Sequence, residues 1–118
     1  MTGAIVGPGP RRLLVDGRDV APLVLADTPR SRRTGLLGST ELRGALWITR
    51  CPSVHMVGMV YPIDVAVVDR RGRVVKTATL RAGIGATWPL PGRSATIEMP
   101  VGSLRAWGIA VGSELGHT

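Results

Sequence analysis

The sequence predicts a mainly β protein: a compact β-sandwich or a partly open barrel of about seven or eight short strands, with two short helices. Its apolar runs are short and are separated by turn residues. The 16 glycines and 9 prolines among 118 residues make long helices rare. Hydrophobic residues form 44% of the chain, which excludes a protein that is disordered overall. We expect a flexible N-terminal tail over residues 1–11 and a single β-rich domain over residues 12–118.

The first predicted element is a β-hairpin. Residues 12–15 form a short apolar run, and Asp16-Gly17 is a pair typical of hairpin turns. Residues 20–26 then form the returning strand. Because Pro22 lacks a backbone N–H, it favours an edge position for this strand.

A short basic helix follows the hairpin. Asp27 or Thr28 can cap its N-terminus, and proline suits the first turn of a helix over residues 29–34. We expect Gly35 to end this helix. The apolar residues 45–49 then predict the next strand.

The clearest strand covers residues 63–68, which are apolar on both faces and therefore predict a central position in the sheet. Residues 54–60 are a further extended candidate before it. Asp69 and Gly72 suit the two ends of a four-residue turn, and residues 73–80 return along the central strand.

The C-terminal part contains one long loop and three short elements. The loop covers residues 81–94, and residues 95–99 form a strand in which polar Thr96 and Glu98 alternate with apolar residues. Pro100 opens a short helix that ends at Gly108, and a last strand is expected within residues 109–115. The helix carries one apolar stripe made of Val101, Leu104 and Trp107.

The charge and the cysteine content limit the class of protein to which this chain can belong. A formal net charge of +7 attracts anionic partners, and the single cysteine, Cys51, permits no internal disulfide. The N-terminal residues lack the order of charges of a signal peptide, and no apolar run is long enough to span a membrane. We therefore expect a cytoplasmic protein.

The arginines raise the hypothesis of a nucleic-acid-binding domain driven by the net charge. A phosphate-binding surface needs its basic residues on one face, and the sequence does not show that these clusters converge. We therefore treat nucleic acid as a less favoured partner. The clusters are Arg11-Arg12 in the tail, Arg30, Arg32 and Arg33 in the helix, and Arg70, Arg71 and Arg73 near the hairpin turn.

Residues 51–59 collect reactive side chains. Cys51, His55, Met56 and Met59 are ligand types that suit copper(I). On a strand, however, His55 and Met59 lie ~13 Å apart at ~3.3 Å per residue, and Met56 points to the other face. Because the chain has no phenylalanine, we favour methionines that fill the core. We predict neither a metal nor a cofactor.

Two further hypotheses concern the same region. Cys51 and His55 could form a nucleophile pair, with Asp64 orienting the imidazole, in a hydrolase or thiol enzyme. Asp64 opens an apolar strand, so its carboxylate needs an arginine or backbone N–H partners. It serves either as a structural clamp or as a polar anchor in a pocket. Trp88, in the long loop, either covers a small anionic ligand or caps the core.

The order and spacing of several motifs resemble the bacterial and archaeal domain of unknown function family 192 over residues 23–115. This resemblance implies a compact β-sandwich or barrel with short helices, and it carries no established activity, cofactor or catalytic residue. The chain departs from the family at Met56 and Val57, where the family often has a bulky aromatic residue, and at Ser113, where the family has aspartate. The motifs are RRTGLLG from Arg32, GALW from Gly44, CPSVH from Cys51, MVYPIDV from Met59, DRRGRV from Asp69, IEMPVG from Ile97 and GIAVG from Gly108.

Our leading hypothesis is a non-catalytic module that binds a small molecule or a protein partner. We place its ligand site at the end of the central strand, where His55 would donate a hydrogen bond to the ligand and Asp64 would be the fixed polar group. Met59 and Trp88 would supply apolar walls.

Overall fold

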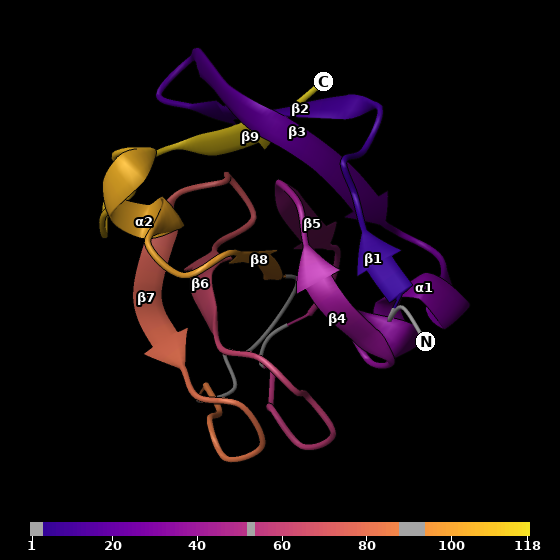
Figure 1. Cartoon of the computed structure of the whole chain (residues 1–118). Helices are drawn as coiled ribbons and strands as arrows, with labels where there is room; N and C mark the ends of the chain where they lie inside the picture. Colours follow the sequence, from indigo (N-terminus) through magenta and orange to yellow (C-terminus); the bar gives the residue numbers. More distant parts are fainter. Residues whose placement is uncertain (1–3, 52–53, 88–93) are drawn as a thin grey trace.

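The computed structural model describes residues 4–51, 54–87 and 94–118. This part of the chain contains nine strands and two helices (Figure 1). The strands are β1 (Ala4–Val6), β2 (Arg11–Val15), β3 (Arg18–Ala26), β4 (Ser39–Leu42), β5 (Ala45–Ile48), β6 (Ile63–Val68), β7 (Val74–Leu80), β8 (Ala95–Met99) and β9 (Leu115–His117). The helices are α1 (Pro29–Thr34) and α2 (Ser103–Ala106). Seven strands form one sheet in the order β7-β6-β8-β5-β3-β2-β9, and β1 pairs in parallel with β4 in a second, small sheet.

The large sheet curls until its edge strands, β7 and β9, approach each other at one end. Arg73 and Glu114 form an antiparallel bridge there. The Leu115 N–H donates to the Gly72 carbonyl at 2.8 Å, and the Val74 N–H donates to the Ser113 carbonyl at 2.8 Å. The fold is therefore mainly β, as predicted, and of the two predicted architectures it is the partly open barrel.

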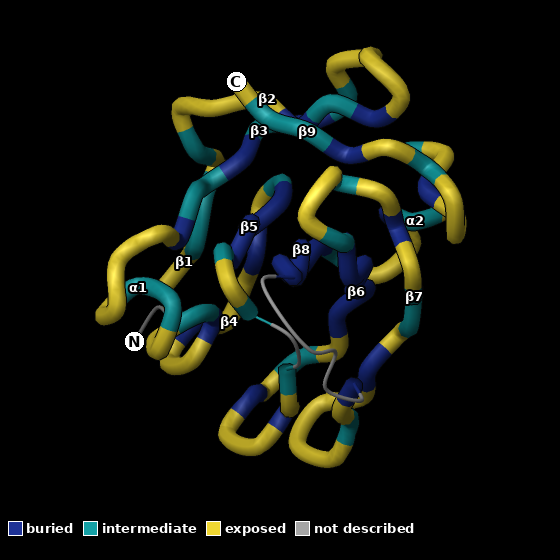
Figure 2. Tube along the Cα trace, turned by 180° about the vertical axis from the view of Figure 1, so that it is seen from behind, coloured by how far each residue is buried: buried dark blue, intermediate teal, exposed yellow. Residues whose placement is uncertain are grey.

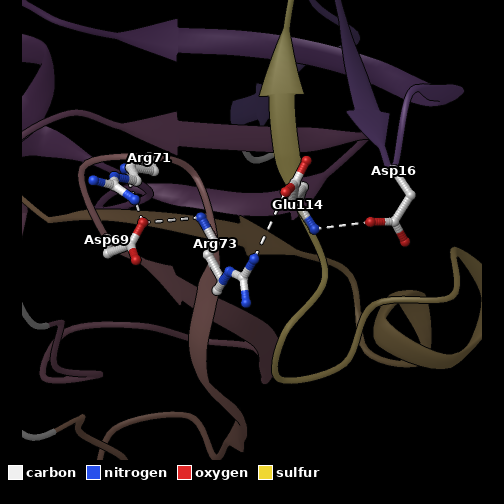
Figure 3. A network of polar contacts seen from close by, with 5 residues as sticks. All are labelled: Asp16, Asp69, Arg71, Arg73 and Glu114. Carbon is white, nitrogen blue, oxygen red and sulfur yellow. Dashed lines mark hydrogen bonds and ion pairs between the residues drawn. The ribbon is translucent and has the colours of Figure 1, made fainter.

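Polar contacts reinforce this seam (Figure 3). The Asp69 carboxylate accepts hydrogen bonds from the backbone N–H groups of Arg71 and Arg73, at 2.8 and 3.0 Å. The Arg73 guanidinium lies 3.9 Å from the Glu114 carboxylate, and the Glu114 N–H donates to Asp16 at 2.9 Å. The backbone hydrogen bonds hold the pKa of the exposed Asp69 carboxyl below its usual value. The network ties the β6–β7 turn to the β2–β3 turn.

The β6–β7 hairpin confirms the clearest sequence prediction. All six residues of β6 are buried between β7 and β8. Gly72 has a φ of +83°, which the turn requires and which glycine adopts without strain. Figure 2 shows the buried central strands β5, β6 and β8 in dark blue, with exposed loops at the rim of the sheet.

A separate hydrophobic core lies on each face of the sheet, because the central strands are covered on both sides. The first core has Leu104 of α2 packed against it and includes Leu13, Leu23, Trp47, Ala66, Ile97 and Met99. The second core lies under α1, β4 and residues 54–61, and includes Leu36, Leu42, Leu46, Met56, Met59, Ile63 and Val65.

The N-terminal hairpin and helix form as predicted, with one correction. Strand β3 lies between β2 and β5, so the predicted edge position is wrong. Pro22 is tolerated because pairing with β5 begins only at Leu23. Thr28 caps α1: its Oγ1 accepts from the Ser31 N–H at 3.0 Å, while Ser31 Oγ accepts from the Thr28 N–H at 3.0 Å.

Two strands were not expected from the sequence. Strand β1 lies inside the segment assigned to the tail, and it pairs with the equally unexpected β4. The C-terminal helix α2 follows Pro100 as predicted, and Leu104 and Trp107 pack against the first core. Val101, predicted for the same stripe, is 53% exposed. Neither helix in the described residues has the length and apolar character needed to cross a bilayer.

Candidate functional site

A cavity of about 130 Å³ lies on the α1 side of the sheet. Cys51, His55 and Met59, all singled out from the sequence, line it together with the carboxylate-bearing Glu98. Its other walls come from the end of α1 and from apolar side chains of the second core: Arg32, Arg33, Thr34, Gly35, Leu36, Leu37, Ile48 and Val54.

A loop rather than a strand carries His55 and Met59 to this cavity, so the predicted strand over residues 54–60 is wrong. Gly58 has a φ of +86°, and the Met59 N–H donates to the Met56 carbonyl at 3.0 Å, which closes a turn. The loop is fastened to residues 83–87 by a bridge between His55 and Ala86. Because the turn reverses the chain, His55 and Met59 face one cavity instead of lying apart along a strand.

The methionines of this loop belong to the core. Met56 is fully buried and Met59 is 9% exposed, and both contact the second core. This confirms the interpretation that sulfur side chains fill a core that contains no phenylalanine. Within residues 4–51, 54–87 and 94–118, no group of three His, Cys, Asp or Glu side chains is arranged to hold a metal ion.

Glu98 is the chemically unusual group of the cavity. It pairs with Leu46 of β5 and Val65 of β6, so its side chain leaves the sheet among second-core residues. Only 5% of the residue is exposed, and burial raises the pKa of its carboxyl from 4.5 to about 7. In the described part of the chain, no hydrogen bond or ion pair reaches this carboxylate. A carboxylate that is so little exposed and has no protein donor is costly to ionise. Its oxygens reach the cavity, because among the described residues no fully buried side-chain oxygen lacks a hydrogen-bond partner.

Tyr61 packs against the second core, on the face of the sheet from which Glu98 projects. Its hydroxyl is 2.7 Å from Ser39 Oγ, which fixes the ring beside β4. Burial raises the pKa of Tyr61, and the negative charges of Glu98 and Glu41 add smaller contributions in the same direction.

Asp64 lies on the opposite face of the sheet and acts as a clamp. It is 3% exposed, and its Oδ1 accepts a hydrogen bond from the Thr79 hydroxyl at 2.7 Å. Its Oδ2 accepts from the backbone N–H groups of Gly102 and Leu104, at 3.0 and 3.2 Å. These are the backbone donors that the sequence analysis required, and they fix the start of α2 against β6 and β7.

The predicted site residues therefore divide into three groups. Cys51, His55 and Met59 meet in the cavity, whereas Asp64 does not line it and does not orient the His55 imidazole. Trp88 lies outside the described residues. Sequence reasoning missed Glu98 because alternation of polar and apolar residues is also typical of a half-exposed strand.

Comparisons with known proteins place this fold in a family. The model of the domain of unknown function 192, described as "Uncharacterized ACR", matches residues 13–117. A crystal structure of a protein of unknown function from Novosphingobium aromaticivorans DSM 12444 is similar, with a TM-score of 0.72 and 25% identity, covering 98% of this chain and 93% of that one.

A second similar structure is that of a proposed transcription regulator from Sinorhizobium meliloti 1021. Its TM-score is 0.65 and its identity 18%, covering 91% of each chain, and at this identity it shows the fold alone. Comparison with curated proteins gives no match. Since the family model spans nearly the whole described fold, the chain belongs to the domain of unknown function family 192.

Proposed function

We propose that this protein is a small-molecule-binding module whose site is the Glu98 cavity. The observation that carries the proposal is the buried carboxylate of Glu98, which lacks a hydrogen-bond donor among the described residues and lines a cavity with His55 and Met59. A ligand that donates hydrogen bonds to Glu98 would remove the cost of its burial. Binding would thereby gain both from this contact and from the apolar walls.

The chemistry of the cavity favours a neutral donor. Arg32 and Arg33 line its mouth, and the protein carries a net charge of +7, so a cationic ligand would be repelled. A neutral amide or urea group offers N–H donors without that repulsion. The volume of about 130 Å³ suits a ligand, or one end of a ligand, of only a few heavy atoms.

Methylurea is a suitable probe, because one N–H from each of its two nitrogens can face the two oxygens of one carboxylate. We expect saturable changes in amide NMR shifts around Gly35, His55 and Glu98. Because the ligand binds the ionised carboxylate, the pKa of Glu98 should fall on binding, and the affinity should rise between pH 6 and pH 8.

Two variants test the assignment. Glu98→Gln should abolish the saturable shift changes, whereas Glu41→Gln, a change of the same chemistry at an exposed carboxylate beside Arg43, should leave them intact. The proposal fails if methylurea gives no saturable change, if Glu98→Gln binds equally well, or if the affinity falls with pH. Acetate, which cannot donate a hydrogen bond at these pH values, should not bind.

A thiol enzyme using Cys51 and His55 is the second candidate function, because both residues line the same cavity. If His55 activates the thiol, alkylation of Cys51 by iodoacetamide should proceed readily below the ordinary thiol pKa, and His55→Ala should slow it. Equal alkylation rates in the two proteins at every pH would exclude this candidate.

A further inference from the structure

A second cavity, of about 300 Å³, adjoins the Glu98 cavity and is lined by three arginines. Arg32 and Arg33 come from α1, and Arg50 follows the end of β5. Its remaining lining residues in the described part of the chain are Pro29, Ile48, Thr49 and Cys51, and none of them carries a carboxylate. Three positive charges therefore line one space without an opposite charge among these residues.

The ion pairs of the described residues leave these three arginines unused. Arg12, Arg43 and Arg73 each pair with a carboxylate, whereas other arginines, Arg105 among them, do not. Among the described residues, no hydrogen bond or ion pair engages the guanidinium group of Arg32, Arg33 or Arg50. Each guanidinium carries five N–H donors in a planar fork, which matches the oxygens of an anion.

The backbone conformation at Arg50 indicates that the fold positions this arginine. Arg50 has a φ of +52°, a conformation uncommon for any residue other than glycine. The preceding residue, Thr49, is held by a hydrogen bond from its N–H to the Ala26 carbonyl, at 3.1 Å. The strained turn thus begins where β5 is still attached to β3, and it brings Arg50 beside the arginines of α1. Strain of this kind is typical of functional positions.

We propose that Arg32, Arg33 and Arg50 form a binding site for a phosphate group, either as inorganic phosphate or as a phosphate monoester. A phosphate dianion offers three or more oxygens and two negative charges to several guanidinium forks at once, whereas a carboxylate offers two oxygens and one charge. The net charge of +7 strengthens the attraction at low salt. The three guanidinium groups line one open cavity of about 300 Å³, which has room for one phosphate group rather than for the regularly spaced phosphates of a nucleic acid.

The site is separable from the Glu98 cavity, although the two share Arg32 and Arg33. Among the described residues, no hydrogen bond or ion pair joins Glu98 to Arg32 or Arg33. Glu98→Gln should therefore leave phosphate binding unchanged. Phosphate binding can thus succeed or fail independently of methylurea binding.

The test is a calorimetric titration of the whole chain at low salt with inorganic phosphate and, separately, with adenosine 5′-monophosphate. Arg33→Gln and Arg50→Gln should each weaken binding about tenfold, the effect of losing one charge-assisted contact. The matched control is Arg105→Gln, which removes the same charge from the exposed face of α2, on the other side of the molecule from α1 (Figures 1 and 2). It should change the affinity less than about twofold.

The two ligands separate the two sources of phosphate. Tighter binding of the nucleotide identifies a phosphate monoester as the ligand, and equal or weaker binding identifies inorganic phosphate. The proposal is overturned if neither ligand binds saturably, or if Arg105→Gln weakens binding as much as Arg50→Gln. It is also overturned if a single-stranded oligonucleotide binds while both small phosphates do not. Circular dichroism confirms that each variant is folded.

Discussion

Replacing Glu98 by glutamine removes a charge that the folded protein holds in a nearly dry position. Glutamine has almost the same shape, so the second core should keep its packing around Leu46 and Val65. The variant therefore isolates the cost of ionising a buried carboxyl group. Its effect on the free energy of unfolding should depend strongly on pH.

The magnitude follows from the pKa of the carboxyl group. Since burial raises that pKa from 4.5 to about 7, and one pKa unit corresponds to about 1.4 kcal/mol, ionised Glu98 lowers the stability by about 3 kcal/mol. The folded state binds the proton more tightly than the unfolded state. The contribution of Glu98 is therefore most favourable below pH 4.5, declines as the pH rises toward 7, and is constant above that.

Urea unfolding of both proteins at pH 4.5, 6 and 8 measures this effect. Because all other groups titrate alike in the two proteins, the difference between their free energies of unfolding isolates position 98. Relative to its value at pH 4.5, that difference should shift in favour of Glu98→Gln by about 3 kcal/mol at pH 8. A difference that is the same at all three pH values, or that favours the wild type increasingly at high pH, would refute the reasoning. Glu41→Gln, at an exposed ion pair, should change the stability by less than about 1 kcal/mol.

Three further substitutions test the scaffold by chemical denaturation. Asp64→Asn removes the negative charge of the side chain that accepts hydrogen bonds from two backbone N–H groups at the start of α2. It should lower the free energy of unfolding by about 2 kcal/mol. A loss below about 0.5 kcal/mol would contradict the role of Asp64 as a clamp. Gly72→Ala should lower the free energy of unfolding by about 2–3 kcal/mol more than Gly17→Ala. Both glycines have positive φ, but of the two only Gly72 would place a Cβ 2.4 Å from a backbone oxygen, that of Leu115. Equal losses of stability would show that this close approach is relieved by a small shift of the backbone. Glu114→Gln should change the stability by less than about 1 kcal/mol, since the pair with Arg73 is exposed, and a larger loss would mean that the seam depends on this ion pair.

Local sequence signals predicted those elements that are stabilised by contacts among their own residues. The β6–β7 hairpin followed from six apolar residues and a turn in which Asp69 binds the backbone and Gly72 has positive φ. Helix α1 followed from Thr28, whose reciprocal hydrogen bonds with Ser31 are local. In both cases the deciding interactions span only a few residues, so the sequence contains them directly.

The elements that were missed depend on distant partners. Strand β4 has the sequence STEL, which is too polar to indicate a strand, and it forms because β1, more than thirty residues earlier, lies beside it. Residues 54–60 have strand-like composition, but Gly58 and hydrogen bonds to residues 83–87 fold them into a loop. Pro22 indicated an edge strand, yet pairing on its β5 side begins one residue later.

The candidate site was predicted only in part, because some of its residues are also brought together by distant pairings. Cys51, His55 and Met59 were chosen for their chemistry and do share a cavity. Glu98 was passed over because only the pairing of β8 with both β5 and β6 makes that strand fully buried. Asp64 needed a buried partner, but the sequence could not show that this partner is the start of α2 on the opposite face.

The pairing of β2 with β9 has a consequence for the order in which the chain folds. Its contacts join residues far apart, since the Glu114 N–H and the Asp16 carboxylate are separated by 98 residues and the Arg12 N–H and the Thr118 hydroxyl by 106. Closing so long a loop is costly in entropy, so these pairings should form after the local hairpins. Until then, β2 presents an unpaired edge, which is the surface through which two chains would associate. Slow folding at high protein concentration should therefore produce aggregates that begin at β2.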